Sequence, residues 1–227
     1  MSTSVFVITI DGPTASGKGT IARIVAEKLG FHYLDSGALY RLVALSALRS
    51  NISAEDETAI AALAATLPCR FEGNRIFLGN EDVTETIRAE EVGNMASQVG
   101  AWPAARQALI SLQIGFKCPP GLVADGRDMG TVIFPDAQLK VFLTASVDVR
   151  AERRYKQLIE KGFPAKIFNL RQDLSERDKR DSNRNVAPLV PATDAQTLDT
   201  TDLGINEAVS KVLEWYKAKK NKRSHFL

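Results

Sequence analysis

The sequence is poor in the residue types on which several kinds of protein chemistry depend. Its 227 residues include only two cysteines, Cys69 and Cys118, which lie far apart and lack the CxxC spacing of zinc sites and redox motifs. The two histidines, His32 and His225, are too few for chemistry built on histidine clusters. We therefore expect reduced thiols rather than a disulfide scaffold, and we assign neither histidine a catalytic role.

Long apolar runs are also missing. The run Val5–Ile10 ends well short of the roughly 18 residues that a membrane-spanning helix needs. Met1–Ser4 has no basic residue and precedes a strand-like run, so we expect no secretory signal and a cytoplasmic location. With 44% apolar and 25% charged residues, the composition is typical of a soluble globular protein and excludes disordered or collagen-like chains.

The net charge of +2 offers no broad cationic surface for nucleic acid, but the charge is unevenly placed. Residues 51–91 contain nine acids and three bases, whereas residues 147–184 contain eleven bases and seven acids. Seven of those eleven bases are arginine, which suits the binding of a small, mobile anion. The lysine-rich stretch 211–223 is typical of a solvated helix end.

Short apolar strands alternate with helices along the chain. The strand Val5–Ile10 is followed by a Gly-rich turn and a helix over 19–29, which Gly30 ends. The other strand candidates are Phe31–Leu34, Leu122–Ala124, Lys140–Leu143 and Gln196–Leu198. Five strands interleaved with helices predict an α/β fold, with a five-stranded parallel sheet covered by helices on both faces.

Two segments interrupt this alternation. After a helix from Asp35 to about Arg49, the chain predicts a helix over 54–66 opened by a capping box at Ser53–Asp56. Three short strands near 69–83 and helices over 84–99 and 103–116 follow, as expected for a subdomain inserted on the sheet. The second interruption, residues 147–184, reads as two helices divided by Gly162 and Pro164.

The strongest motif is GPTASGKGT over residues 12–20, which follows the first strand and opens the first helix. In such a P-loop, backbone N–H groups and the helix N-terminus form a cradle for anions, and the lysine, here Lys18, reaches the terminal phosphates. The alternative is a tight turn that uses its glycines only for their conformational freedom. Gly19 follows the lysine directly and the hydroxyl comes at Thr20, an ending that resembles the nucleoside-monophosphate kinases. A signalling GTPase is disfavoured, because the DxxG and NKxD elements that GTPases need do not occur downstream.

Polar side chains that could bind a second substrate occur in three further places. Ser36, Tyr40 and Arg41 open the second helix, where a phosphate could bind, although Arg41 could equally pair with an acid. The loop Asp125–Gly130 follows a buried strand, at the sheet edge where ligands bind in open α/β folds. Over residues 177–184, Arg177, Arg180, Asp181 and Arg184 share one helix face, which by itself favours a surface helix with salt bridges.

Together these segments resemble the bacterial cytidylate kinases of the nucleoside-monophosphate kinase family, over nearly the whole chain. The resemblance rests on DGP at 11–13, GKGT at 17–20, LDSGALYR at 34–41, ASQV at 96–99, ADGRDMGTVIFPDA at 124–137, ERDKRDSNR at 176–184 and APLVPA at 187–192. It implies one P-loop kinase domain over 1–227, with a monophosphate-binding subdomain over 37–120 and a helical lid over 147–184. Thr14 and Ala15 depart from the family, where smaller residues are common.

The resemblance also implies roles for individual residues. ATP would be bound by Gly12, Pro13, Thr14, Ala15, Ser16, Gly17, Lys18, Gly19 and Thr20. CMP would be bound by Ser36, Tyr40, Arg41, Ser97, Arg106, Arg127, Asp128, Asp181 and Arg184, with the two arginines Arg41 and Arg127 on its phosphate and Asp181 on its ribose. The residues expected to act in catalysis are Lys18, Arg127 and the lid arginines Arg150, Arg154 and Arg177.

The reaction implied is Mg²⁺-dependent transfer of the γ-phosphoryl group of ATP to CMP or dCMP, by a monomeric enzyme. The acceptor oxygen is already ionised near neutral pH, so no general base is required, which agrees with the scarcity of histidine. ATP would carry most of the Mg²⁺ coordination, with Thr20 nearest the metal. The alternatives are a kinase for UMP, AMP or another small acceptor, and an ATP-binding switch that transfers nothing.

Overall fold

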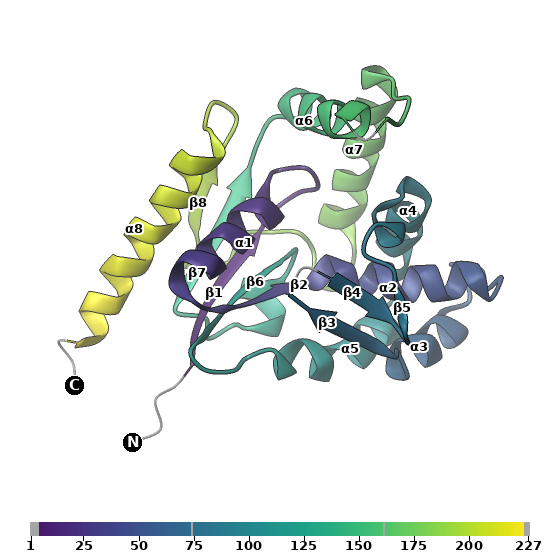
Figure 1. The fold of residues 1–227 in the computed structure, drawn as a ribbon, viewed down its shortest axis with the longest axis horizontal. Coiled ribbons are helices and arrows are strands. Elements are labelled where there is room, and N and C mark those ends of the chain that lie inside the picture. The colour runs from purple at the N-terminus through teal and green to yellow at the C-terminus, as the bar shows by residue number, and fades with distance from the viewer. Residues whose placement is uncertain (1–4, 74, 161, 225–227) are drawn as a thin grey trace. The chain divides into compact units, whose positions relative to one another are not determined.

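The computed structural model describes residues 5–73, 75–160 and 162–224 (Figure 1). The chain divides into two units, of which unit 1 comprises Met1–Leu34 and Gly115–Leu227 and unit 2 comprises Asp35–Ile114. The absence of a secretory signal was inferred from Met1–Ser4, which lies outside the described residues, as does His225. Each unit is described by itself below.

The five strand candidates form a single sheet in the order β2-β6-β1-β7-β8. Their bounds are β1 Phe6–Asp11, β2 His32–Asp35, β6 Gly121–Gly126, β7 Leu139–Thr144 and β8 Gln196–Asp199. The central strand β1 pairs in parallel with β6 and β7, and β7 pairs in parallel with β8. The sequence-based prediction of a five-stranded parallel sheet is therefore confirmed, and the carboxyl ends of the paired strands lie at one edge.

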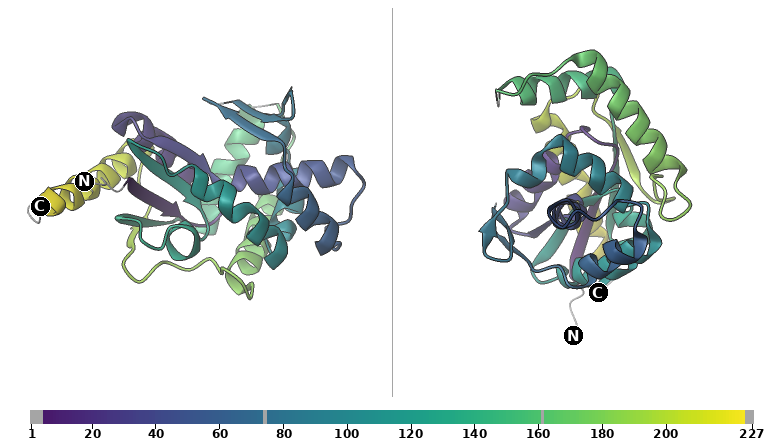
Figure 2. Two further views of the ribbon diagram at one scale, coloured as in Figure 1. Left: turned by 90° about the horizontal axis from the view of Figure 1, so that it is seen from below. Right: turned by 90° about the vertical axis from the view of Figure 1, so that its right-hand side faces the viewer.

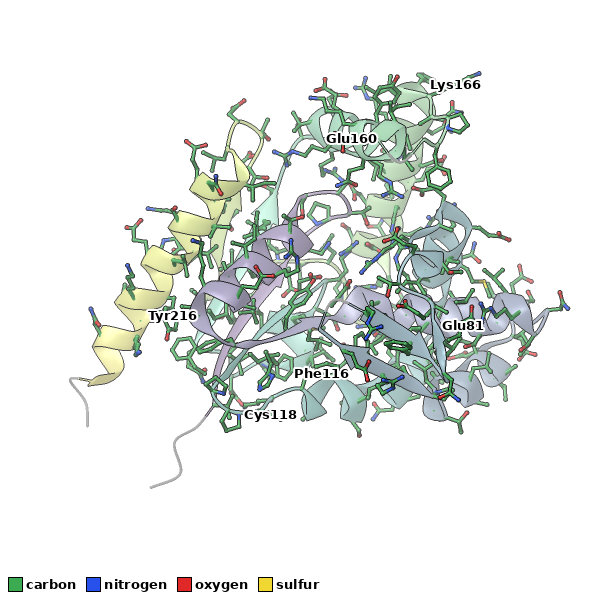
Figure 3. The ribbon with its side chains drawn as sticks, viewed as in Figure 1. Glu81, Phe116, Cys118, Glu160, Lys166 and Tyr216 are labelled. Atoms are coloured by element: carbon green, nitrogen blue, oxygen red, sulfur yellow. The ribbon has the colours of Figure 1, made fainter. Side chains whose placement is uncertain are left out.

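Both faces of β1 are buried, as a strand in the middle of a parallel sheet requires. Ile8 and Ile10 face a core made with helix α1 (Lys18–Leu29) and helix α8 (Ile205–Ser224), while Val7 and Thr9 are buried on the opposite face. Tyr216, labelled in Figure 3, lies on α8. Its ring meets the Phe6 ring edge-on, with 5.0 Å between ring centroids. This packing fixes α1 against the sheet, and with it the loop that precedes α1.

The arginine-rich segment forms two helices of unit 1, α6 (Val147–Glu160) and α7 (Ile167–Asn183), which pack on each other around Ala151, Leu170 and Leu174. Glu160 and Lys166 flank the turn at their outer tip (Figure 3). The chain follows the predicted division into two helices at Gly162 and Pro164. The assignment of 147–184 as a lid remains a prediction.

Unit 2 combines helices with a small antiparallel sheet of order β3-β4-β5 (Figure 2). Its elements are α2 (Ser36–Arg49), α3 (Glu57–Ala65), β3 (Cys69–Glu72), β4 (Arg75–Leu78), β5 (Glu81–Asp82), the 3₁₀ helix η1 (Thr86–Arg88), α4 (Glu90–Val99) and α5 (Pro103–Gly115). α2 packs closely against α4 and more lightly against α3. The small sheet predicted near 69–83 is present, apart from Asn74, which lies outside the described residues.

Two of the helix predictions for this unit need correction. The helix expected over 54–66 begins at Glu57, because the Asp56 side chain, not Ser53, caps it by accepting from the backbone N–H of Ala59 at 3.0 Å. The helix expected over 84–99 is divided into η1 and α4 at Ala89, whose backbone is extended. None of the helices in the described part of the chain combines the length and apolar sequence needed to cross a membrane.

Candidate active site

The GPTASGKGT loop joins β1 to α1, and its first glycine is required by the sheet itself. A Cβ on Gly12 would come within 2.3 Å of the Leu143 carbonyl oxygen in the neighbouring strand β7. At the other end, Gly17 adopts a φ of 87° and places no side chain over the N-terminus of α1. The first turn of α1 also contains no acidic residue. Its N–H groups therefore form the kind of anion cradle that the motif predicts.

Lys18 is the first residue of α1 and folds back over this loop. Its Nζ donates to the carbonyl oxygen of Pro13 at 3.4 Å, so the ammonium group lies above the loop and not along the outside of the helix. The role of Lys18 beside the terminal phosphates stays a prediction. Ser16, in the middle of the loop, is fully buried, and its carbonyl oxygen accepts a hydrogen bond from the Thr200 hydroxyl at 3.4 Å.

The unusual glycine after the lysine has a steric explanation. A Cβ on Gly19 would lie 3.2 Å from Oδ2 of Asp125, the buried carboxylate at the end of β6. The same oxygen accepts a 2.6 Å hydrogen bond from the Tyr33 hydroxyl, which fixes its position. The sequence placed Asp125 in a functional loop without giving it a role and gave none to Tyr33. Their juxtaposition with α1 depends on the strand order, which no local pattern encodes.

Arg127, at the same edge of the sheet, is held by three partners. Its Nε donates to Asp181 Oδ2 at 2.8 Å, its Nη2 donates to Thr14 Oγ1 at 2.5 Å, and its Nη1 donates to the Gly126 carbonyl at 3.1 Å. The P-loop, which the sequence assigned to ATP, thus meets the GRDMG loop and α7, whose Arg127 and Asp181 it assigned to CMP, at one guanidinium group. All three belong to unit 1.

Asp181 is buried, although the charge pattern of α7 by itself favoured a solvated surface helix. Burial raises the pKa of Asp181, but the charges of Arg127, Arg177 and Arg184 and the hydrogen bond from Arg127 outweigh it and hold that pKa below its usual range. A surface salt-bridge role is therefore wrong for Asp181. It is a buried, ionised carboxylate stabilised by the charges of nearby arginines.

Asp11, the last residue of β1, belongs to the DGP motif, but the sequence gave it no role of its own. Its two carboxylate oxygens accept from the backbone N–H groups of Met129 and Gly130 at 2.9 and 2.8 Å. Asp11 thereby caps the short π-helical turn η2 (Met129–Ile133), which directly follows the buried Asp128. The position of the GRDMG loop thus depends on this carboxylate.

Burial raises the pKa of Asp11 from 3.8 to about 7, partly offset by the two backbone hydrogen bonds. Since the folded protein holds this proton more tightly than the unfolded chain, the contribution of Asp11 to stability is full below about pH 3.8 and is lost as the pH rises through about 7. The difference in unfolding free energy, wild type minus Asp11→Asn, should therefore fall by roughly 1–3 kcal/mol between pH 5 and pH 8. Urea unfolding at several pH values measures it, and a difference independent of pH would contradict the assignment.

Arg150 of α6 is the most enclosed of the lid arginines, with a side chain 3% exposed. It forms a two-pronged ion pair with Asp178 of α7, with N–O distances of 3.1 and 2.5 Å. Its Nη1 also donates to the Thr14 carbonyl at 3.1 Å, and its Nε donates to the Ala145 carbonyl at 3.0 Å. Arg150 therefore joins both helices to the P-loop, and its link to α7 depends on Asp178. The sequence had given Asp178 no role.

Replacing Asp178 with alanine should destabilise the helix pair α6–α7, because the buried Arg150 guanidinium then loses its counter-charge. We expect a loss of about 3 kcal/mol of unfolding free energy, measured by urea unfolding, and faster amide exchange in both helices. Asp148→Ala is the matched control, since it breaks another α6–α7 ion pair, with Arg171, in which both side chains are more than 60% exposed. That change should cost less than about 1 kcal/mol. Equal losses in the two variants would contradict this role of Asp178.

The other predicted lid residues occupy different surroundings. Arg153 donates to the Thr200 carbonyl at 2.5 Å, so a second arginine of α6, besides Arg150, bonds another segment of unit 1. Arg154 is partly exposed and donates to Gln157 at 3.5 Å. Arg184 ends α7 and donates from Nε to the Ala187 carbonyl at 2.7 Å. Arg177 contributes to the positive surroundings of Asp181.

In unit 2, the start of α2 carries the predicted acceptor residues Ser36, Tyr40 and Arg41. Ser36 and Tyr40 are buried, and the Asp35 side chain caps the helix by accepting from the Ala38 N–H at 3.0 Å. Arg41 extends toward the break between η1 and α4, where its Nη1 donates to the Ile87 carbonyl at 2.6 Å.

Ser97 and Arg106, from α4 and α5 of the same unit, are both buried. The Arg106 guanidinium carbon lies 5.5 Å from the centre of the Tyr40 ring, and its Nη1 donates to the Gly100 carbonyl at 3.0 Å. The Ser97 hydroxyl has no hydrogen-bond partner among the described residues. A buried hydroxyl without a partner can accept or donate a hydrogen bond to a polar ligand.

The predicted site residues thus form two groups, one in each unit. Unit 1 brings together the P-loop, the acceptor-side residues Arg127, Asp128, Asp181 and Arg184, and the arginines of α6 and α7. Unit 2 contains Ser36, Tyr40, Arg41, Ser97 and Arg106. Within the first group, the contacts of Arg127 already connect the nucleotide loop to the acceptor residues.

The oxygen donors beside the P-loop fit Mg²⁺, which prefers oxygen ligands and retains several waters when it binds with a nucleotide. Thr20 supplies a hydroxyl in the first turn of α1, and the Asp125 carboxylate packs against the same turn at Gly19. Among the described residues, no group of three or more histidine, cysteine, aspartate or glutamate side chains is arranged to hold a metal by itself. That ATP carries most of the Mg²⁺ coordination stays a prediction.

Comparison with known proteins agrees with this geometry. The family model described as cytidylate kinase matches residues 8–218. A cytidylate kinase of Bordetella bronchiseptica is 58% identical over 212 residues, covering 93% of this chain and 95% of the relative. Those of Cupriavidus pinatubonensis and Paraburkholderia phymatum are 58% and 59% identical, covering 95% and 93% of this chain and 98% and 93% of the relatives.

Proposed function

The chain belongs to the cytidylate kinase family, and on this basis we propose that it transfers the γ-phosphoryl group of ATP to CMP or dCMP, giving ADP and CDP or dCDP. One observation supports this reaction above all. Arg127 of the GRDMG loop is bound to the P-loop hydroxyl of Thr14 and to Asp181 of α7. The P-loop and a partly buried arginine–aspartate pair suited to a nucleoside phosphate therefore adjoin within unit 1.

In this mechanism the donor phosphates lie in the cradle formed by the loop N–H groups and the N-terminus of α1. Lys18, already folded over the loop, neutralises charge that develops on the transferred group. Arg127 and Arg41 bind the acceptor phosphate, whose oxygen is ionised near neutral pH, so no general base is needed. Mg²⁺, held by Thr20 and the donor phosphates, would supply further charge neutralisation.

We propose the following residues for recognition of the nucleoside. Ser97 and Arg106, with Asp128 and Arg184, are proposed to bind the cytosine, and Asp181 to accept from the ribose. Ser36 and Tyr40 are proposed to line the acceptor phosphate site beside Arg41. The unsatisfied Ser97 hydroxyl supports this proposal, because a ligand group would complete its hydrogen bonding.

The helices α6 and α7 are proposed to act as a lid, with Arg150, Arg154 and Arg177 near the transferred phosphoryl group. Closure of a lid would exclude water, which otherwise consumes ATP by hydrolysis. The ion pair between Arg150 and Asp178 gives this lid a rigid base at the P-loop. We place the reaction in the cytoplasm and propose a monomer.

An acceptor panel tests the proposal. Purified protein with ATP and Mg²⁺ should phosphorylate CMP and dCMP with a higher kcat/KM than UMP or AMP. Preference for AMP or UMP would assign the chain to another monophosphate substrate. If the protein bound ATP but converted no monophosphate, the chain would be a nucleotide-binding switch and not an enzyme.

Replacing Asp181 with alanine should lower the kcat/KM for CMP more than the kcat/KM for dCMP. Only CMP carries the 2′-hydroxyl from which the Asp181 carboxylate would accept a hydrogen bond. We expect kcat/KM for CMP to fall about tenfold further than that for dCMP, the range of one hydrogen bond to a charged group. Some loss for dCMP is expected as well, since Asp181 also holds Arg127. Asp173→Ala, an exposed aspartate on the same helix, is the control and should leave the ratio unchanged. An unchanged ratio in Asp181→Ala would contradict the ribose assignment.

A further inference from the structure

The P-loop carries a side chain that its nucleotide-binding chemistry does not require. ATP phosphates are bound by the backbone N–H groups of such a loop, so the Thr14 hydroxyl is not needed for that cradle. This hydroxyl instead accepts from Nη2 of Arg127 at 2.5 Å. We propose that Thr14 is a positioning residue for the acceptor substrate, which holds Arg127 in the orientation that binds the CMP phosphate. The inference rests on the proposed function, because it assumes that Arg127 binds this phosphate.

Thr14 is itself firmly held. Its carbonyl oxygen accepts from Nη1 of the buried Arg150 at 3.1 Å. The next residue, Ala15, has a φ of 61°, a conformation that costs a non-glycine residue energy and persists only where the surroundings impose it. Ala15 packs against the core of the helix pair α6–α7, around Leu170 and Leu174. The Thr14 hydroxyl is therefore a fixed acceptor and not the end of a mobile loop.

The contacts of Arg127 also indicate that the Thr14 hydroxyl should strengthen CMP binding. A guanidinium group has five N–H donors, and three of them serve Asp181, Thr14 and the Gly126 carbonyl. A phosphate bound through two parallel hydrogen bonds needs two donors. The three contacts thus fix the plane of the guanidinium and leave enough donors for the ligand. Without the hydroxyl, Arg127 is held at fewer points and loses more freedom when CMP binds.

Thr14→Val removes the hydroxyl and keeps the shape of the side chain, whereas Thr14→Ser keeps the hydroxyl. We expect Thr14→Val to raise the KM for CMP and the Kd for CMP, measured by titration calorimetry without ATP, about 3- to 10-fold. The KM for ATP should change less than the KM for CMP. Thr14→Ser should stay within about twofold of wild type. A loss caused by disturbed folding would raise both KM values and lower the melting temperature.

A double-mutant cycle with Arg127→Ala decides whether Thr14 acts through this arginine. In the Arg127→Ala background, Thr14→Val should cause no further loss of kcat/KM for CMP. The inference is overturned if the KM for CMP of Thr14→Val equals that of wild type, or if the substitution raises the KM values for ATP and CMP equally. It is also overturned if Thr14→Val still lowers kcat/KM for CMP in the Arg127→Ala background. These outcomes are distinguishable from failure of the proposed function, in which the wild-type protein itself would not phosphorylate CMP.

Discussion

Replacing Lys18 with alanine is expected to lower kcat for CMP phosphorylation about 10²- to 10⁴-fold, with a smaller change in the KM for CMP. Lys18 is the lysine of the P-loop, and its Nζ lies 3.4 Å from the Pro13 carbonyl, above the anion cradle. Charge on the transferred group grows toward the transition state. An ammonium group at this position therefore contributes more to the rate than to binding of the acceptor.

Steady-state kinetics with ATP and CMP varied separately measures this effect. The matched control is Lys28→Ala, which removes an exposed lysine from the last turn of the same helix and should leave kcat within twofold of wild type. A Lys18→Ala enzyme with kcat within threefold of wild type would show that the lysine does not act on the transferred group. A change confined to the KM for CMP would contradict its assignment to the ATP side.

Replacing Arg127 with alanine should lower kcat/KM for CMP about 10³-fold or more. The change removes a proposed phosphate ligand and also leaves the buried Asp181 carboxylate without its closest guanidinium partner. Arg127→Lys should restore little of the lost kcat/KM. The planar guanidinium of Arg127 donates to Asp181, Thr14 and Gly126 from three different nitrogen atoms, and a single ammonium group cannot make all three contacts.

The control for this prediction is Arg23→Ala, which breaks an exposed ion pair with Glu27 on α1 and should have little effect on either substrate. The KM for ATP should rise less in Arg127→Ala than the KM for CMP. If Arg127→Lys retained most of the wild-type kcat/KM, a positive charge at this position would be enough for catalysis. The proposal that the planar guanidinium geometry is required would then be wrong.

The sequence predicted most of the sheet because its strands are short apolar or β-branched runs bounded by turn residues. The ends of several helices were also readable, since Gly30 adopts the left-handed conformation that ends α1 and Pro103 opens α5. The start of α3 was predicted wrongly because Ser53 and Asp56 are both good caps, and local pattern alone does not choose between them.

The break between η1 and α4 has a tertiary origin. No proline or glycine marks Ala89, but the Ile87 carbonyl there accepts a hydrogen bond from Arg41 of α2 in place of one from the next helical turn. A partner so far along the chain overrides a helical pattern that is locally consistent. Such an interaction cannot be read from periodicity.

The candidate site shows the same division. Motifs identified the P-loop and the GRDMG loop, because their backbone geometry and charge density require particular residue types at a few consecutive positions. The links between them were not visible, since Arg127 with Asp181 and Arg150 with Asp178 join residues from different segments. Asp11 was missed for the same reason, as its role depends on the parallel pairing of β1 with β6, which brings η2 beside it.

The central claim, that this chain phosphorylates CMP, is tested most directly by the products of a single reaction. Purified protein is incubated with ATP, Mg²⁺ and CMP, and the nucleotides are separated by ion-exchange chromatography over time. We predict that CDP and ADP appear in equal amounts and that no ADP forms when CMP is omitted. Formation of ADP without CDP, or no consumption of CMP at any ATP concentration, would contradict the account.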